Sequence, residues 1–229
     1  MVTTRTRLRV GCAAAVFAAV YIGGGGAQVP PRQLPLPYDG DANQVVTVVA
    51  DHSGATTATL TAWERLHGGW RAVIGPVPAR VGAEGIGNAN ENSSRTPAGT
   101  WTITEVFGLE TADDALLPYR RVGTSDWWVS DVHSRHYNTH VHCDRGSCPF
   151  DETASENLGE IGPIYNHAIV IDYNRAPVIP GAGSAFFLHA TNGQPTAGCV
   201  AIPAADLPTL LRWLDPAEHP VIDIGVVMR

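Results

Sequence analysis

Short runs of β-branched and aromatic residues recur along most of this chain, and turn-forming residues separate them. The run at 45–49 is Val-Val-Thr-Val-Val, and runs at 57–63 and 70–74 follow after Asp-His-Ser-Gly and Gly-Gly. Such residues fit a pleated, half-buried surface, while glycine and aspartate interrupt it. We therefore expect a mostly β domain that begins as a β-meander. Further strand-like runs lie at 100–107, 127–132, 168–172, 185–189 and 221–227.

One late segment has the period of a helix instead. Pro203 suits a first helical turn, and Asp215-Pro216 would end the helix. The apolar face of this helix is expected to hold four leucines: Leu207, Leu210, Leu211 and Leu214.

The start of the chain, residues 1–27, has the layout of a secretory signal peptide. Three arginines precede an apolar run at 10–22, and small residues follow, with Gly25 and Ala27 at the −3 and −1 positions. A membrane span needs about 18 apolar residues, so this run is short for one. We expect an exported protein with no stable membrane span after leader cleavage. The proline-rich residues 28–44 would form an extended linker before one domain at 45–229.

All fifteen basic residues are arginine, and the formal charge is −7. Removal of the three leader arginines would take the charge of the remainder to −10. The absence of lysine excludes Schiff-base chemistry, a Walker A lysine and the Ser-x-x-Lys machinery of penicillin-binding enzymes. No nucleic-acid partner is expected, because such proteins carry a basic face.

Three cysteines remain after the leader, and an odd number leaves one thiol unpaired in an oxidising compartment. Cys143 and Cys148 bracket a short polar loop, a spacing that can close as a disulfide. Cys199 is then the free thiol.

Cys199 follows His189 by ten positions, with turn-forming residues between them and an apolar run on each side. A thiol needs a nearby base to act as a nucleophile at neutral pH, and a strand-loop-strand hairpin would bring the two side chains together. The N–H groups of Gly198 and Cys199 would face a developing oxyanion. The alternative is a structural cysteine and a buried histidine on neighbouring strands.

Several segments in order resemble the L,D-transpeptidase catalytic (YkuD-like) family, cysteine enzymes of the bacterial cell wall. The resemblance covers about 45–227 and implies a β-sandwich or barrel with one late helix packed on it. The segments that carry it are 95–100 (Arg-Thr-Pro-Ala-Gly-Thr), 126–131, 134–138, 155–158, 165–167, 172–174, 180–184 and 189–200.

The signature of this family is a histidine, a spacer, then Ser-His-Gly-Cys and usually an arginine. His189 matches the first histidine and Cys199 the cysteine. Thr196 stands where the serine would be, Ala197 replaces the second histidine, and Ala201 replaces the arginine. The sequence thus looks like a branch variant with Thr-Ala-Gly-Cys.

The resemblance implies Cys199 as nucleophile, His189 as general base and acid, and the Ala190 carbonyl as the group that orients His189. Gly198 would supply an oxyanion N–H. The substrate-binding positions would be Tyr165, His167, Thr196 and Ala197.

The implied reaction is acyl transfer between peptidoglycan stem peptides through a Cys199 thioester, without a metal or organic cofactor. An amine acceptor gives L,D cross-links, whereas water as acceptor would make the protein an L,D-carboxypeptidase. Carbapenem-type β-lactams are the expected inhibitors, and the cell wall is the expected location.

Two alternatives come from other classes. A zinc-dependent wall hydrolase would use a cluster between His133 and Cys148, since imidazole and thiolate are preferred zinc ligands, although the spacing fits no standard finger. A wall-binding module without catalysis is disfavoured because His189, Gly198 and Cys199 are all retained. The zinc ligands would come from His133, His136, His140, His142, Cys143 and Cys148.

Overall fold

The computed structural model describes residue 1 and residues 32–227. The expected leader falls outside them apart from Met1, as does the start of the expected linker. None of the described helices is long and apolar enough to cross a membrane.

The described chain is built mainly from strands, with one α-helix and three short 3-10 helices. The first strands are β1 (Gln44–Ala50), β2 (Thr57–Leu66), β3 (Gly69–Arg80), β4 (Ile86–Gly87), β5 (Thr96–Pro97), β6 (Gly99–Thr102) and β7 (Val106–Gly108). The later elements are β8 (Tyr119–Arg121), β9 (Asp126–Trp128), β10 (His140–His142), η1 (Glu152–Ala154), β11 (Glu156–Asn157), η2 (Pro163–Tyr165), β12 (Ala168–Val170), β13 (Phe187–Ala190), β14 (Val200–Ile202), α1 (Leu207–Trp213), η3 (Pro216–Glu218) and β15 (Val221–Val226).

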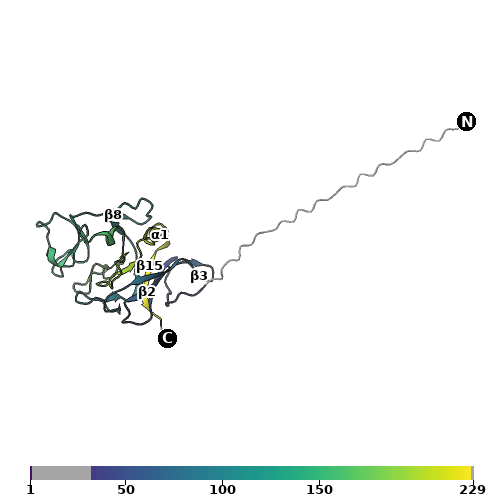
Figure 1. The fold of residues 1–229 in the computed structure, drawn as a ribbon, viewed down its shortest axis with the longest axis horizontal. Helices are drawn as coiled ribbons and strands as arrows, with labels where there is room; N and C mark the ends of the chain where they lie inside the picture. The colour runs from purple at the N-terminus through teal and green to yellow at the C-terminus, as the bar shows by residue number, and fades with distance from the viewer. Residues whose placement is uncertain (2–31, 228–229) are drawn as a thin grey trace.

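Ten of these strands form one mixed sheet in the order β6-β15-β1-β2-β3-β14-β13-β12-β7-β8. Figure 1 labels four of them: β2, β3, β8 and β15. The antiparallel pairs β1–β2 and β2–β3 are the expected meander, which is confirmed. Parallel pairs β1–β15, β13–β14 and β7–β8 make the rest of the sheet mixed. The fold class, mainly β with one late helix, is therefore confirmed.

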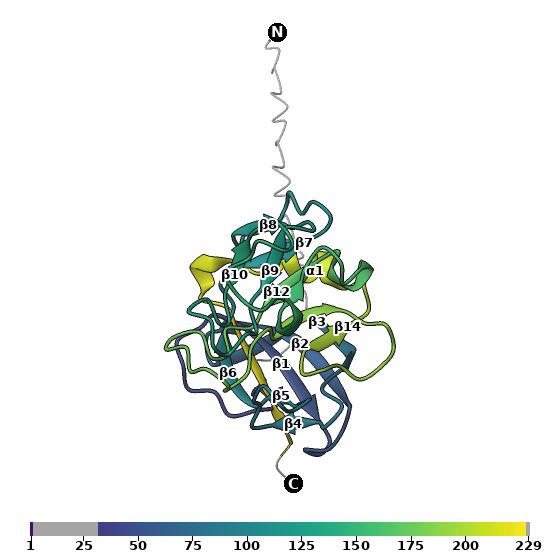
Figure 2. The same ribbon diagram turned by 90° about the vertical axis from the view of Figure 1, so that its left-hand side faces the viewer.

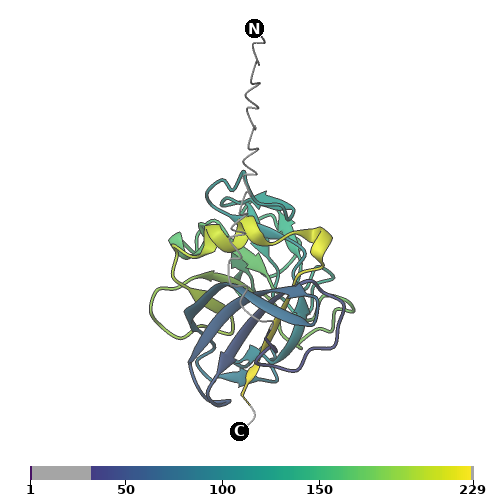
Figure 3. The same cartoon turned by 90° about the vertical axis from the view of Figure 1, so that its right-hand side faces the viewer.

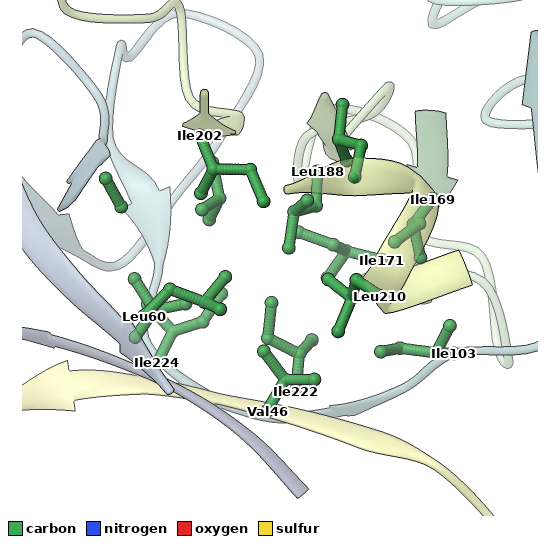
Figure 4. Packing of buried hydrophobic residues seen from close by; sticks show 14 of the residues in the cluster. Val46, Leu60, Ile103, Ile169, Ile171, Leu188, Ile202, Leu210, Ile222 and Ile224 are labelled. Atoms are coloured by element: carbon green, nitrogen blue, oxygen red, sulfur yellow. The ribbon is translucent and has the colours of Figure 1, made fainter. Parts of the chain in front are cut away.

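The core lies between the two halves of this sheet, of which the first is β6-β15-β1-β2-β3 and the second is β14-β13-β12-β7-β8. Val46 and Leu60 from the first half, and Leu188 from the second, are fully buried in one hydrophobic cluster. In Figure 4 their side chains point into a common space that α1 also enters. The figure also labels Ile103, Ile169, Ile171, Ile202, Leu210, Ile222 and Ile224 of this cluster.

The expected helix is confirmed as α1, although it begins later than Pro203. Asp206 is the N-cap residue and Pro208 occupies the first turn, because the chain from Pro203 first makes a separate turn in which Asp206 N–H donates to the Pro203 carbonyl at 3.0 Å. Figure 3 shows the helix in yellow, beside the blue strands of the first half. The four predicted leucines are all buried: Leu207, Leu210, Leu211 and Leu214.

The run at 100–107 was expected to be one strand, and it is two. β6 pairs with β15 in one half of the sheet, whereas β7 pairs with β12 and β8 in the other. The chain crosses between the halves at 103–105, where Ile103 is buried and its N–H donates to Pro220 O at 3.0 Å. The hydroxyls of Thr102 and Thr104 both donate to Asp172, at 2.8 and 2.9 Å, and fix this crossing.

A separate three-stranded sheet, β10-β9-β11, takes up the run expected at 127–132, and only its start is a strand. The strand ends at Trp128, although Val129 beyond it stays buried. The Cys143–Cys148 disulfide closes the loop after β10, with a Cα–Cα distance of 5.4 Å, and confirms the predicted pairing. In Figure 2 this region lies toward one end of the molecule, with the two-stranded sheet β4-β5 toward the other.

Candidate active site

Cys199 is the free cysteine of the described residues, and it is buried just before β14. Its thiol donates to the Ala185 carbonyl at 3.4 Å, and the Phe187 N–H approaches Sγ at 3.4 Å. Burial and the charge of Glu156 raise the pKa of the Cys199 thiol to about 12. The resting side chain is therefore a neutral thiol.

The strands around Cys199 do not form the expected hairpin, because β13 and β14 are parallel. The loop between them carries the chain back to the start of β13, so that Leu188 pairs with Val200 and His189 with Ala201. Cys199 thus lies beside Phe187. Phe187 and His189 are two residues apart on β13, so their side chains share one face of the strand, about 6–7 Å apart.

His189 is buried, and its Nδ1 lies 2.8 Å from the Ala190 carbonyl. A carbonyl accepts only, so Nδ1 carries the proton and Nε2 has a lone pair free. Burial lowers the pKa of His189, which favours this neutral form. Within the described residues no hydrogen bond joins His189 to the Cys199 thiol.

The turn before Cys199 is fixed by one hydroxyl. Thr196 Oγ1 accepts from Gly198 N–H at 3.1 Å and donates to the Cys199 carbonyl at 2.6 Å. The sequence placed Thr196 among the substrate-binding positions. Both hydrogen bonds of its hydroxyl are instead made within the turn. The Gly198 N–H, which the sequence led us to expect at an oxyanion, is likewise engaged within the turn.

A cavity of about 210 Å³ opens at Cys199. Ala197, Gly198 and Cys199 are among the residues that line it. The remaining lining residues include polar groups that sequence reasoning did not single out: Asn90, Glu91, Ser93, Ser130, Glu156 and Ser184.

Tyr165 and Glu156 form a hydrogen-bonded pair beside this cavity. The Tyr165 hydroxyl donates to Glu156 Oε2 at 2.8 Å, and its ring packs edge-on against His189 with centroids 5.3 Å apart. Tyr165 and Cys199 belong to the same buried cluster. Burial raises the pKa of Tyr165 well above its usual range, so the phenol stays protonated.

His167 stands apart from this group. Its Nε2 lies 3.2 Å from Thr111 O, and the ring lines a different cavity, beside Pro208 and Leu211 of α1. The structure thus brings Tyr165 and Ala197 to Cys199, and leaves His167 outside.

The residues proposed for zinc are used otherwise. Cys143 and Cys148 are joined in the disulfide, so their thiolates are not available as ligands. His140 Nε2 and His142 Nδ1 both face Asp126 Oδ1, at 2.8 and 3.0 Å. Among the described residues, no group of three or more His, Cys, Asp or Glu side chains is arranged to hold a metal ion.

Comparison with known proteins adds to this geometry. No curated protein matches the chain. Among solved structures, the helical cell shape determining protein Pgp2 from Campylobacter jejuni aligns with a TM-score of 0.39 and 12% identity, over 83% of this chain. The alignment covers 53% of that protein, so the chain spans about half its length.

A family model gives the decisive result. The model of the L,D-transpeptidase catalytic domain, YkuD, matches residues 46–222, which is most of the chain and includes both His189 and Cys199. The chain therefore belongs to the L,D-transpeptidase catalytic domain (YkuD) family of peptidoglycan enzymes.

Proposed function

We propose that this protein is an exported cysteine acyltransferase that forms L,D cross-links in peptidoglycan through a thioester on Cys199. The observation that supports the proposal is a free thiol at a cavity and beside Phe187, two residues along the strand from a histidine whose Nδ1 is held by the Ala190 carbonyl. In this arrangement the lone pair of Nε2 is available to take a proton. The same proposal divides the chain into a leader at 1–27, a linker at 28–44 and a catalytic domain at 45–229.

The first half-reaction begins when the Cys199 thiol turns from the Ala185 carbonyl toward His189. Nε2 takes the thiol proton, and the thiolate attacks the carbonyl carbon between an L-configured residue and the D-residue that follows it. The Cys199 N–H donates to the oxyanion. The C–N bond then breaks, His189 returns its proton to the departing amine, and the L-residue remains as a thioester.

The second half-reaction releases the enzyme. The amine of another stem peptide attacks the thioester carbonyl, its proton passes to His189, and the thiolate leaves and is reprotonated. With water as the attacking group the product is a shortened stem, as in an L,D-carboxypeptidase. The shielding of the thioester from water decides between these products.

Intact-mass measurement tests the acyl-enzyme directly. The protein without residues 1–27 is incubated with a tetrapeptide stem and, separately, with a carbapenem. We expect one adduct per molecule on the wild type and none on Cys199→Ala, because the sulfur forms the acyl bond. His189→Ala should slow adduct formation by about 10²–10⁴-fold, since it removes the general base.

A matched control replaces an exposed residue of the same loop that takes no part in the proposed chemistry. Gln194 is exposed in the loop before Cys199, and Gln194→Ala should acylate like the wild type. Equal adducts on wild type and Cys199→Ala, or none on either, would refute the thioester. The released stem products, cross-linked or trimmed, then distinguish transferase from hydrolase.

A further inference from the structure

The carbonyl that accepts the Cys199 thiol belongs to a residue in an unfavourable backbone conformation. The thiol donates to Ala185 O at 3.4 Å, and Ala185 has a φ of +57° although it carries a side chain. Residues other than glycine, asparagine and aspartate seldom adopt this left-handed conformation, because Cβ then crowds the following carbonyl. Contacts from elsewhere in the fold must therefore hold Ala185 in place.

The side chain of Asn138 supplies that contact. Its Oδ1 accepts from the Ala185 N–H at 3.2 Å and from Trp128 Nε1 at 2.9 Å. Its Nδ2 donates to the carbonyls of Tyr173 and Asn174, at 3.0 and 2.8 Å. Asn138 is buried, and all four hydrogen-bonding positions of its amide are occupied, so the amide cannot turn over without losing every partner.

Asn138 lies in the segment 134–138, which resembled the family but has no part in the proposed reaction. Its own φ is +57°, a conformation that asparagine adopts more readily than most residues. The hydroxyl of Tyr137, the residue before it, accepts from the Gly183 N–H at 3.0 Å. Two consecutive residues of this segment thus fix the chain at Gly183 and Ala185, directly before β13.

We propose that Asn138 is a positioning residue: it fixes the Ala185 carbonyl and thereby holds the Cys199 thiol away from His189 in the resting protein. This rests on the proposed acyl transfer, in which the thiol must turn toward His189. Only a neutral thiol can donate to a carbonyl, so the hydrogen bond to Ala185 opposes ionisation of Cys199. Oxidants attack the thiolate, so the same hydrogen bond would protect a free thiol after export.

The strain at Ala185 opposes the hold that Asn138 exerts. If Ala185 relaxed to a negative φ, its carbonyl would turn away from Sγ and the thiol would be released. The hydrogen bond from Ala185 N–H to Asn138 resists this change, whereas the cost of the left-handed conformation favours it. Substitutions at the two residues should therefore change the reactivity of Cys199 in opposite directions.

Alkylation by iodoacetamide at neutral pH, without any peptide, tests the proposal. In the protein without residues 1–27, Cys199 is the one cysteine outside the Cys143–Cys148 disulfide, so intact mass reports its reaction alone. The sulfur displaces iodide, and the thiol proton passes to His189. Asn138→Gly removes the amide and still permits the left-handed backbone. It should speed alkylation by about three- to tenfold, the factor that one neutral hydrogen bond contributes.

Ala185→Gly tests the opposite direction and remains informative if Asn138→Gly fails to fold. Glycine adopts a positive φ without the cost that alanine bears, so the carbonyl should be held more firmly and alkylation should slow by about threefold. In the Asn138→Gly protein, adding Ala185→Gly should return the rate toward that of the wild type. If glycine merely loosened the chain, Ala185→Gly would speed alkylation in both proteins, and the proposal would be wrong.

Asn174→Gly is the matched control. Asn174 also has a positive φ, of +54°, and its Nδ2 donates to the carbonyls of Ile179 and Gly183, both at 2.9 Å. It braces the same loop, but no hydrogen bond of the described chain joins its side chain to Ala185. Its replacement should leave the alkylation rate unchanged, and equal gains in Asn174→Gly and Asn138→Gly would overturn the proposal.

A His189→Ala background separates release of the thiol from local unfolding. The gain caused by Asn138→Gly should disappear there, because the released thiol then has no base to take its proton. A gain of the same size without His189 would mean that the site had unfolded, which would also overturn the proposal. If the alkylation rates behave as expected but stem peptides form no adduct on Cys199, the acyl transfer is refuted and the role of Asn138 stands.

Discussion

Both the backbone conformation and the lack of space at position 198 require a glycine. Its φ of +143° lies outside the range that side-chain-bearing residues adopt readily. A Cβ at this position would meet the Phe186 ring at 2.6 Å and the Arg95 carbonyl at 3.1 Å. The turn that presents Cys199 is therefore closed on both sides of Gly198, and a side chain at this position would have to displace the Phe186 ring or the Arg95 backbone.

We predict that Gly198→Ala lowers the free energy of unfolding by about 3 kcal/mol, because strain and a ring clash add at one position. It should also slow adduct formation on Cys199. Gly193→Ala is the control: Gly193 has a φ of +88° with open space around it, so only strain of about 1 kcal/mol is expected. Chemical denaturation and intact mass measure both effects, and equal losses in the two variants would contradict the clash.

The local parts of the site could be predicted from sequence, and the remote parts could not. His189, Gly198 and Cys199 lie in one short segment, and odd-cysteine counting together with the family resemblance marks the thiol. Glu156 and Glu91 are far from Cys199 along the chain and follow no spacing rule, because only the folded sheet brings them to one cavity. The resemblance included Glu156 in a matching block, but nothing in that block distinguishes its carboxylate from that of a solvated acid.

At the scale of single elements, β15 contains a polar group that a central strand rarely tolerates. Asp223 lies between β1 and β6 in the sheet, 5% exposed. Thr100 donates to Oδ1 at 3.0 Å, while Oδ2 has no partner among the described residues. Thr47, its neighbour in register on β1, donates its hydroxyl to the Thr61 carbonyl instead, at 3.3 Å.

We predict that Asp223→Asn raises the free energy of unfolding at pH 7.5 by about 1 kcal/mol, because it removes a buried charge. Burial raises the pKa of Asp223, so the wild type loses stability as the pH rises from the unfolded pKa through the folded one. The gain should therefore vanish below about pH 4, near the usual pKa of aspartate. Denaturation at several pH values checks this, with the exposed Asp39→Asn as control, and a gain that is independent of pH would contradict it.

The pairing of elements was harder to predict than their existence. Alternating β-branched runs identify β1, β2 and β3, and adjacent antiparallel strands are the simplest way to connect them. The parallel partners of β1 and β13 depend instead on contacts made elsewhere in the fold. For this reason a hairpin was expected at His189, and a single strand at 100–107, where the chain in fact crosses between the halves of the sheet.

At the scale of the whole molecule, α1 stabilises the fold by filling the space between the two halves of the sheet. Leu210 is 1% exposed and packs in the cluster that joins them. We predict that Leu210→Ala lowers the free energy of unfolding by about 2–5 kcal/mol through loss of burial and the cavity left behind. Arg212→Ala, on the exposed side of the same helix, should change it by less than about 0.5 kcal/mol. Comparable losses in the two variants, measured by urea denaturation, would show that the helix does not anchor the core.

The parallel pairing of β1 with β15 has a consequence for the order of assembly. Val45 is matched with Val221, so the first long strand of the domain cannot gain that neighbour until almost the entire polypeptide is available. Contacts this distant in sequence form slowly, because a long loop must close before they stabilise anything. The complete sheet can therefore form only after residues 221–226 have been synthesised, an order of assembly that is compatible with the export proposed above.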